Sequence, residues 1–180
     1  LVQELVCEHP EICAIGVTGQ MHGIVYTDAE GRALSPLITW QDRRSEKPTA
    51  SGKSYADELS GMCNERISGG FGFATHYMMT KTGTLPAGAV YMMSVMDYLL
   101  MRLCALTEPV THASVAASFG LFDVVGGNYS YDRISAAGLD NIRLPKVVNE
   151  RICGNYRGVP VAVAIGDNQA GVFGALAREE

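Results

Sequence analysis

Three short polar segments hold the residue types that can bind a small molecule and act on it. They are GQMHG (residues 19–23), WQDRR (residues 40–44) and GDN (residues 166–168). Each follows apolar residues typical of a β-strand, and α/β proteins bind ligands where such strands end. The three segments are therefore the candidate site of this sequence.

Asp167 is the strongest catalytic candidate. It comes directly after the apolar run VPVAVAI (residues 159–165) and a glycine, and a helix-forming segment follows it. A carboxylate in that position lies at the carboxyl edge of a sheet, and the N–H groups of the next helix favour an anion such as a transferring phosphoryl group. Asp167 or Asn168 equally suits a simple helix cap, worth about 1 kcal/mol, and the residues alone leave both interpretations open.

Gln20, Met21 and His22 offer an amide, a soft apolar contact and an imidazole. Such a set can hold a polyhydroxylated chain by hydrogen bonds on one side and by packing on the other. A lone histidine is more often structural, but Gly19 and Gly23 would let a ligand approach the backbone closely.

Trp40 is the single tryptophan of the chain and stands next to Gln41 and Asp42. Its ring can stack on the apolar face of a sugar while the two polar side chains bind hydroxyl groups. A core tryptophan with a solvated polar tail is the equally open alternative. The sequence has no G-x-x-x-x-G-K-[ST] loop, H-E-x-x-H motif or G-x-S-x-G elbow, so readings based on those signatures lack support.

The predicted secondary structure places these segments at the ends of strands. Apolar runs at residues 14–18, 24–27 and 36–39, with the turn DAEG at 28–31, predict an antiparallel meander. Residues 159–165 predict a strand buried on both faces. Helices are predicted at residues 1–7, 55–62, 75–82, 93–104 and 169–177.

Two segments carry more detailed predictions. SGGFG (residues 68–72) is too rich in glycine for a regular helix and predicts a turn that another group approaches closely. Residues 93–104 have the clearest helical period. The predicted apolar face comprises Met93, Met96, Leu100, Leu103 and Cys104, with Asp97 and Arg102 outside it.

Composition favours a folded domain whose partner is a small molecule. Of 180 residues, 47% are hydrophobic and 18% charged, and the net charge of -5 leaves no basic footprint for nucleic acid. No apolar run reaches the roughly 18 residues that a membrane span needs.

Five scattered cysteines without a C-x-x-C pair favour buried, reduced thiols in a cytoplasmic protein over a disulfide framework or a metal site. No metal ligands are predicted, and a homodimer is compatible with the sequence.

Taken together, five segments resemble the FGGY carbohydrate kinases, and among them the sedoheptulokinase-like and xylulokinase-like members. Their order and wide spacing match that family along nearly the whole chain. The segments are GQMHG (19–23), TWQDRRS (39–45), SVMDYLLMRL (94–103), THASVAASFGLFD (111–123) and IGDNQAGVFGAL (165–176).

The resemblance implies a ribonuclease H-like domain of the actin/hexokinase ATPase type, an α/β fold with a mixed sheet flanked by helices. Sugar and Mg-ATP would meet between two domains, so ATP and Mg²⁺ are the implied cofactors. Residues 1–158 would form the sugar-binding N-terminal domain without its first strands, and residues 159–180 would begin the ATP-binding domain. The implied roles are catalytic base for Asp167, sugar binding for Gln20, Met21, His22, Trp40, Asp42 and Asn168, and nucleotide contact for Gly166.

The implied activity is ATP-dependent phosphorylation of a ketose such as sedoheptulose or xylulose at a primary hydroxyl. The sequence lacks the family's early Asp-x-Gly-Thr phosphate loop and nearly all of its second domain, and it starts at Leu1 inside a predicted helix. We therefore expect a piece of a longer polypeptide that is inactive alone. The alternatives are a non-catalytic sugar-binding or regulatory module, and a kinase of the same family for another sugar or polyol.

Overall fold

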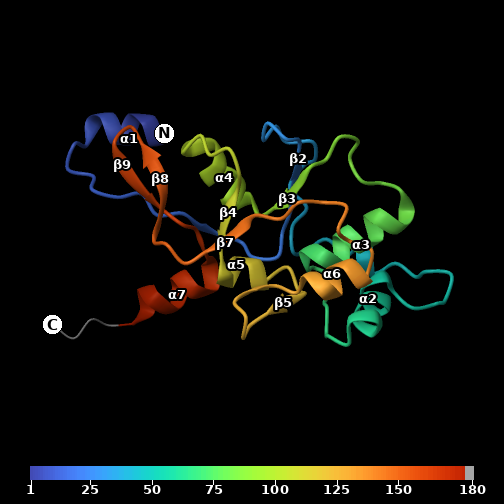
Figure 1. The fold of residues 1–180 in the computed structure, drawn as a ribbon. Helices are drawn as coiled ribbons and strands as arrows, with labels where there is room; N and C mark the ends of the chain where they lie inside the picture. Colours follow the sequence, from blue (N-terminus) through green and yellow to red (C-terminus); the bar gives the residue numbers. More distant parts are fainter. Residues whose placement is uncertain (177–180) are drawn as a thin grey trace.

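Strand pairs alternate with helices along residues 1–176, the part of the chain that the computed structural model describes (Figure 1). The helices are α1 (Val2–Glu8), α2 (Tyr55–Cys63), α3 (Gly72–Thr82), α4 (Val95–Leu103), α5 (Ala113–Ala117), α6 (Tyr131–Ala136) and α7 (Asp167–Ala175), with a 3-10 turn at Arg44–Glu46. The strands are β1 (Thr18–Gly19), β2 (Val25–Thr27), β3 (Tyr91–Met93), β4 (Val110–His112), β5 (Phe122–Asp123), β6 (Asn128–Tyr129), β7 (Lys146–Val148), β8 (Ile152–Tyr156), β9 (Val159–Ala162) and β10 (Ile165–Gly166).

The strands are arranged in small pairs of both directions. β1–β10 and β4–β7 are parallel, while β2–β3, β5–β6 and β8–β9 are antiparallel. Figure 1 shows α1 beside the β8–β9 hairpin at one end of the molecule and α2, α3 and α6 together at the other. The predicted α/β class with mixed strand directions is confirmed.

The predicted meander is only half right. Ile24 bridges Ile38 and Thr27 bridges Ala33, so the second and third predicted strands do form an antiparallel hairpin. Residues 14–18 instead run parallel to the C-terminal strands: Ile15 bridges Val161, and Thr18 pairs with Ile165. Alternation of apolar residues predicts a strand but does not name its partner, and here the partner lies almost 150 residues away.

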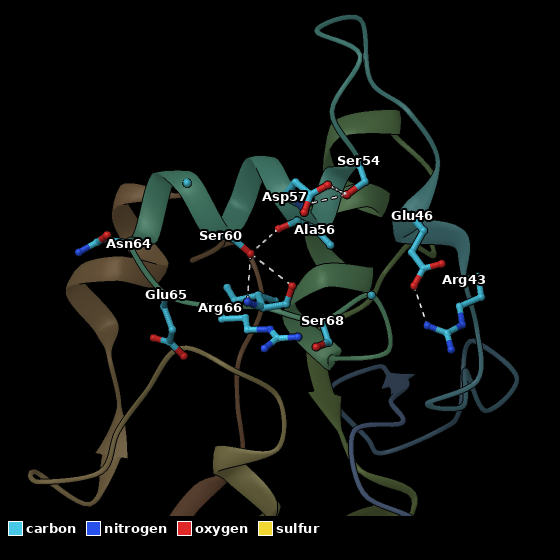
Figure 2. A pocket seen from close by; sticks show the side chains of 13 residues that line it. Arg43, Glu46, Ser54, Ala56, Asp57, Ser60, Asn64, Glu65, Arg66 and Ser68 are labelled. Carbon is cyan, nitrogen blue, oxygen red and sulfur yellow. Dashed lines mark hydrogen bonds and ion pairs between the residues drawn. The ribbon is translucent and has the colours of Figure 1, made fainter.

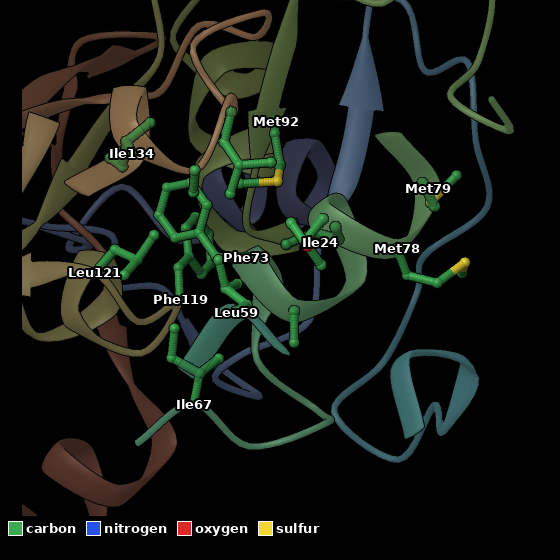
Figure 3. Packing of buried hydrophobic residues seen from close by; sticks show 14 of the residues in the cluster. Ile24, Leu59, Ile67, Phe73, Met78, Met79, Met92, Phe119, Leu121 and Ile134 are labelled. Atoms are coloured by element: carbon green, nitrogen blue, oxygen red, sulfur yellow. The ribbon is translucent and has the colours of Figure 1, made fainter. Parts of the chain in front are cut away.

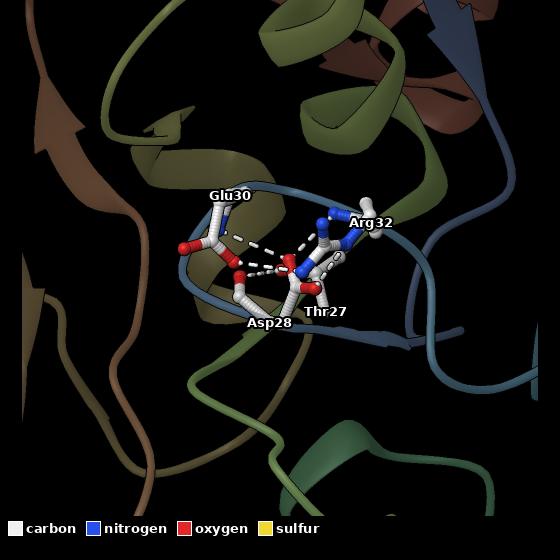
Figure 4. Close-up of polar contacts among 4 residues, drawn as sticks. All are labelled: Thr27, Asp28, Glu30 and Arg32. Atoms are coloured by element: carbon white, nitrogen blue, oxygen red, sulfur yellow. Dashed lines mark hydrogen bonds and ion pairs between the residues drawn. The ribbon is translucent and has the colours of Figure 1, made fainter.

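The turn at residues 28–31 forms as predicted, around the side chain of Asp28 (Figure 4). One carboxylate oxygen, Oδ1, accepts the backbone N–H groups of Glu30 and Arg32 at 3.0 and 2.8 Å, and Oδ2 accepts Nε of Arg32 at 2.6 Å. Gly31 has a φ of +73°, a conformation that glycine adopts without a Cβ penalty. The turn thereby fixes the hairpin that leads to Trp40.

The main core lies where α2 and α3 meet strands β2 and β3 (Figure 3). Every residue of α3 from Gly72 to Met79 is buried, so this stretch of the helix is buried on all sides, including the polar Thr75 and His76. The prediction that residues 68–72 lie outside a helix is wrong for Gly72, which opens α3. A Cβ at Gly72 would meet side-chain atoms of Ile24 and Phe119 at 2.8 and 3.1 Å, and so the glycine permits the close packing.

Helix α4 begins two residues later than the helical period predicts. The predicted polar face is wrong for Asp97. Met93 belongs to β3, and Ser94 caps the helix: its Oγ accepts the N–H of Asp97 at 3.0 Å, while Asp97 Oδ2 accepts the N–H of Ser94 at 3.3 Å. This capping box draws Asp97 into the interior, where it is fully buried. Met96 and Leu100 are buried as predicted.

The C-terminal prediction holds with shifted boundaries. The predicted strand is split into β9 and β10, in which Val161 and Gly166 are buried while neighbouring positions are half-exposed. Helix α7 starts at Asp167 and ends at Ala175; the predicted helix end at Ala177 lies outside the described residues.

The predicted burial of the cysteines is right for Cys63 but wrong for the exposed Cys7 and Cys13. In residues 1–176, no helix is long and apolar enough to cross a membrane.

Candidate functional site

The parallel pair β1–β10 brings two of the three polar segments to one sheet edge. Gly19 lies beside Gly166 in the strand register, so the residues that follow each strand leave at the same carboxyl end. Asn168 Nδ2 lies 3.9 Å from the sulfur of Met21, which joins the two segments across 147 positions of sequence. The structure therefore places Met21 next to Asn168, as a shared site requires.

Gly166 leaves room for Met21. It is buried, and a Cβ there would lie 2.5 Å from both Cγ and Sδ of Met21 and 2.6 Å from Oε1 of Gln169. The family resemblance implies a nucleotide contact for Gly166. Within the described residues, its close neighbours are the side chains of Met21 and Gln169. Sequence reasoning did not single out Gln169, whose Oε1 is buried without a hydrogen-bond partner in the described part of the chain.

Asp167 is the first residue of α7 and is exposed at the sheet edge. One of its carboxylate oxygens accepts the N–H of Asn168 at 2.9 Å. Gly166, not Asp167 or Asn168, occupies the N-cap position, so the helix-cap interpretation of these two residues is wrong. Gly166 adds no side chain at the cap, so the carboxylate of Asp167 is the group that accepts a free N–H at the helix start.

His22 is held in place from two sides. Its backbone N–H donates to Oγ of the buried Ser118 at 3.1 Å, and its ring Nδ1 lies 2.5 Å from the carbonyl oxygen of Ser118. The ring of Phe71 stacks on the imidazole, with centroids 4.6 Å apart and planes 7° from parallel. These contacts support a backbone φ of +70°, which is unusual for a residue with a Cβ.

The contact with Ser118 also decides which nitrogen of His22 carries the proton. A carbonyl oxygen only accepts hydrogen bonds, so Nδ1 must be the donor. In the neutral ring Nε2 is then without a proton and acts as an acceptor. An acceptor of this kind suits a hydroxyl group of a ligand, which donates.

His22 faces a small pocket of about 160 Å³ together with Trp40. The other lining residues are Arg43, Ser68, Gly70 and Phe71. Trp40 is 47% exposed, which contradicts the core-tryptophan alternative and leaves its ring available for stacking. The close approach predicted for SGGFG is also found: a Cβ at Gly70 would collide with the carbonyl oxygen of Trp40.

Asp42 and Gln20 do not line that pocket. Asp42 accepts hydrogen bonds from the backbone N–H, Nε and Nη2 of Arg44 at 2.9, 2.9 and 2.8 Å, and faces a different pocket together with Gln41. The side-chain hydrogen bonds from Arg44 hold the pKa of Asp42 below its usual value. Gln20 folds back so that its Oε1 lies near Gly23, 3.5 Å from where a Cβ would stand.

Sequence reasoning missed Phe71 and Ser118, the two residues that fix His22. Phe71 had a signal, because it lies in the glycine-rich segment for which a close approach was predicted. Ser118 lies in segment 111–123, which carries the family resemblance, but its contact with His22 spans 96 positions and depends on tertiary packing. In residues 1–176 no cluster of three or more His, Cys, Asp or Glu is placed to hold a metal ion.

A model of the N-terminal domain of the FGGY family of carbohydrate kinases matches residues 1–174. The sedoheptulokinase of Homo sapiens is 29% identical over 93% of this chain and 39% of its own length. A xylulose kinase of Streptomyces coelicolor is 31% identical, over 91% of this chain and 37% of its own length. The chain thus spans about two fifths of the length of these curated relatives.

Among solved structures, a xyloylose kinase from Brucella ovis is similar in both fold and sequence. It superposes with a TM-score of 0.76 at 27% identity, covering 94% of this chain and 37% of that one. This likeness agrees with the kinase-type α/β fold expected from the sequence.

Proposed function

The chain belongs to the FGGY family of carbohydrate kinases, and on that premise we propose that the full-length protein transfers the γ-phosphoryl group of ATP to a primary hydroxyl of a ketose. The observation that carries the proposal is the register of β1 and β10, which sets GQMHG and Asp167 at one sheet edge. Residues 1–158 supply the sugar side, and the segment from residue 159 supplies Asp167 and Asn168.

In this mechanism Asp167 is the general base. Its carboxylate accepts the proton of the sugar hydroxyl while the hydroxyl oxygen forms a bond to the γ-phosphorus. The bond from that phosphorus to its bridging oxygen breaks, and ADP leaves with the electron pair. Exposure of Asp167 at the mouth of the strand pair supports this role, because the carboxylate is accessible to a substrate.

His22, Met21 and Trp40 orient the sugar. Nε2 of His22 accepts a hydrogen bond from a hydroxyl, Met21 packs against the carbon chain, and Trp40 covers an apolar face. Asn168, which contacts Met21, offers an amide beside the reacting end. We propose a more remote role for Asp42 and Gln20, which do not line the pocket: Asp42 fixes the loop through Arg44 and Gln20 shapes the turn at Gly23.

The described residues fit only part of a nucleotide site. At the N-terminus of α7, Asp167 accepts the N–H of Asn168, and Gly166 adds no side chain at the cap, so the other N–H groups of the first turn suit the approach of a phosphoryl group. Mg-ATP supplies the phosphoryl group and neutralises its charge when bound. No carboxylate cluster among residues 1–176 would hold the metal ion, so we assign no Mg²⁺ ligands to them. The proposal places the protein in the cytoplasm, with a small sugar as its partner.

An activity screen tests the proposal directly. Full-length protein with Mg-ATP is offered a panel of ketoses, including sedoheptulose and xylulose, and of polyols such as glycerol, and ADP release is followed with a coupled assay. We expect turnover on at least one ketose. Sugar binding in calorimetry without ADP release on any sugar would instead favour the non-catalytic sugar-binding module.

Replacing Ser118 by alanine tests how His22 is held. Without Oγ the N–H of His22 loses its acceptor, so His22 relaxes and binds sugar less well. We expect KM for the sugar to rise about five- to tenfold, as for one lost hydrogen bond, while kcat changes less than about twofold. Imidazole ¹⁵N NMR should show protonation of Nδ1 in both proteins, because the carbonyl oxygen of residue 118 is retained, while the ring signals shift in the variant as His22 relaxes.

Ser114 provides the matched control for this experiment. It lies in α5, the helix that Ser118 ends as the C-cap residue, but its hydroxyl is 2.8 Å from Nδ1 of His112, not His22. Ser114→Ala should leave KM and the His22 spectrum unchanged. Equal effects of the two substitutions would contradict a specific role for Ser118.

A further inference from the structure

The pocket at His22 is small for a sugar site. Its volume of about 160 Å³ lies below the roughly 300–1,000 Å³ of most small-molecule sites. Two of its lining residues are Arg43 and Ser68. Both residues also line a larger pocket of about 840 Å³ beside α2 (Figure 2), so the two hollows share a border.

The loop of residues 66–71 forms that border, and its glycines allow the geometry. Gly70 lies against the carbonyl of Trp40, and a Cβ at Gly69 would meet the side chain of Glu46 at 2.6 Å. Glu46 in turn pairs with Arg43 at 2.6 Å on the rim. The loop therefore lies between the two pockets, with Ser68 in the lining of both.

The larger pocket is polar and suits hydroxyl groups. Its lining combines hydroxyl, amide, carboxylate and guanidinium groups from Arg43, Glu46, Ser54, Asp57, Ser60, Asn64, Glu65, Arg66 and Ser68. Some of these groups already have partners within the protein: Asp57 accepts a hydrogen bond from Ser54, and Glu65 forms an ion pair with Arg133. Arg66 is exposed, and Figure 2 shows its side chain between Glu65 and Ser68. Alternating donors and acceptors match hydroxyls, which do both.

The order of residues gives the site a direction. Met21 contacts Asn168 beside Asp167, His22 follows Met21, and the pocket of His22 leads to Ser68. A chain whose reacting hydroxyl lies at Asp167 therefore extends toward α2. A third pocket, which contains Lys47, meets the His22 pocket at Arg43 but not at Ser68, so it is the less direct continuation.

We propose that the pocket beside α2 is the second half of the sugar site. It binds the end of a long ketose that lies farthest from the phosphorylated hydroxyl, with Arg66 donating to its hydroxyl groups. The protein then prefers a seven-carbon ketose to a five-carbon one, because the shorter chain ends before it reaches this pocket. The inference rests on the proposed kinase function.

The test compares two exposed cations in full-length protein. Arg66→Leu removes the donor from the pocket beside α2, and Lys47→Leu removes the same charge from the third pocket. The measurement is the ratio of kcat/KM for sedoheptulose to that for xylulose, with sugar affinities from calorimetry in parallel. We expect a wild-type ratio above one that falls about tenfold in Arg66→Leu, as for one or two lost hydrogen bonds to a charged donor, and is unchanged in Lys47→Leu.

The outcomes separate this inference from the proposed function. Suppose that both sugars are turned over but Arg66→Leu leaves the ratio of the two kcat/KM values unchanged, or Lys47→Leu lowers it as much as Arg66→Leu does. Either result overturns the extended site and leaves the proposed kinase function standing. A wild-type preference for xylulose does the same. Absence of turnover and of binding for every sugar overturns both.

Discussion

Asp167→Asn in the full-length protein should abolish phosphoryl transfer while sugar binding remains. Asparagine keeps the size of the side chain and an oxygen that accepts the N–H of Asn168, the contact seen at 2.9 Å. It has no carboxylate to take the hydroxyl proton, and loss of a general base costs about 10²- to 10⁴-fold in rate. The measurements are kcat from ADP release and sugar affinity from calorimetry.

Asp132→Asn is the control for this substitution. Asp132 is also an exposed carboxylate in the first turn of a helix, α6, but it lies outside the candidate site. Its replacement removes the same charge from a helix N-terminus and should leave kcat within about twofold, because Asp132 lies outside the candidate site. Turnover of Asp167→Asn at the wild-type rate would refute the role of Asp167 as the base.

Asp97→Asn should stabilise the protein near neutral pH and remove a pH dependence of its stability. Burial raises the pKa of Asp97 from 3.8 to about 7, and its Oδ1 has no hydrogen-bond partner in the described part of the chain. The folded state therefore keeps Asp97 protonated over a range of pH in which the unfolded chain releases the proton. Asparagine is neutral at every pH and keeps an oxygen that can accept the N–H of Ser94.

The sign follows from the direction of the shift. Below about pH 4 the carboxyl is protonated in both the folded and the unfolded state, so its shifted pKa does not lower the free energy of unfolding. As the pH rises from about 4 to about 7, only the unfolded state releases the proton, and the free energy of unfolding falls. The full loss is on the order of 4 kcal/mol at 1.36 kcal/mol per pKa unit. Above pH 7 both states are ionised and the difference no longer changes.

Urea unfolding of wild type and Asp97→Asn between pH 4.5 and 8 provides the measurement. His76 acts in the opposite direction, because burial lowers its pKa to about 4 and its contribution to stability falls as the solution becomes more acidic. This contribution is common to both proteins and cancels in their difference. The free energy of unfolding of the variant should exceed that of the wild type increasingly up to pH 7; a constant difference would contradict the buried, protonated carboxyl.

Local sequence patterns determined the elements and the identity of the segments that form the site. Glycines and polar residues directly after apolar runs identified GQMHG and GDN as strand ends, and both lie at strand ends in the structure. The family resemblance and the α/β class are confirmed. The roles of Asp167 and the sugar-binding residues remain predictions until the experiments above are done.

Only the tertiary structure decided which segments meet. It paired residues 14–19 with the last strands, turned Asp42 toward Arg44, and buried Asp97. It also set Ser118 against His22 and placed Arg43 and Ser68 in the lining of both the His22 pocket and the one beside α2. These contacts connect positions far apart in the chain, so they depend on packing and burial, which local propensity does not encode. GQMHG by itself made a ligand contact one of two interpretations; the direction that we propose for the ligand rests on the fold.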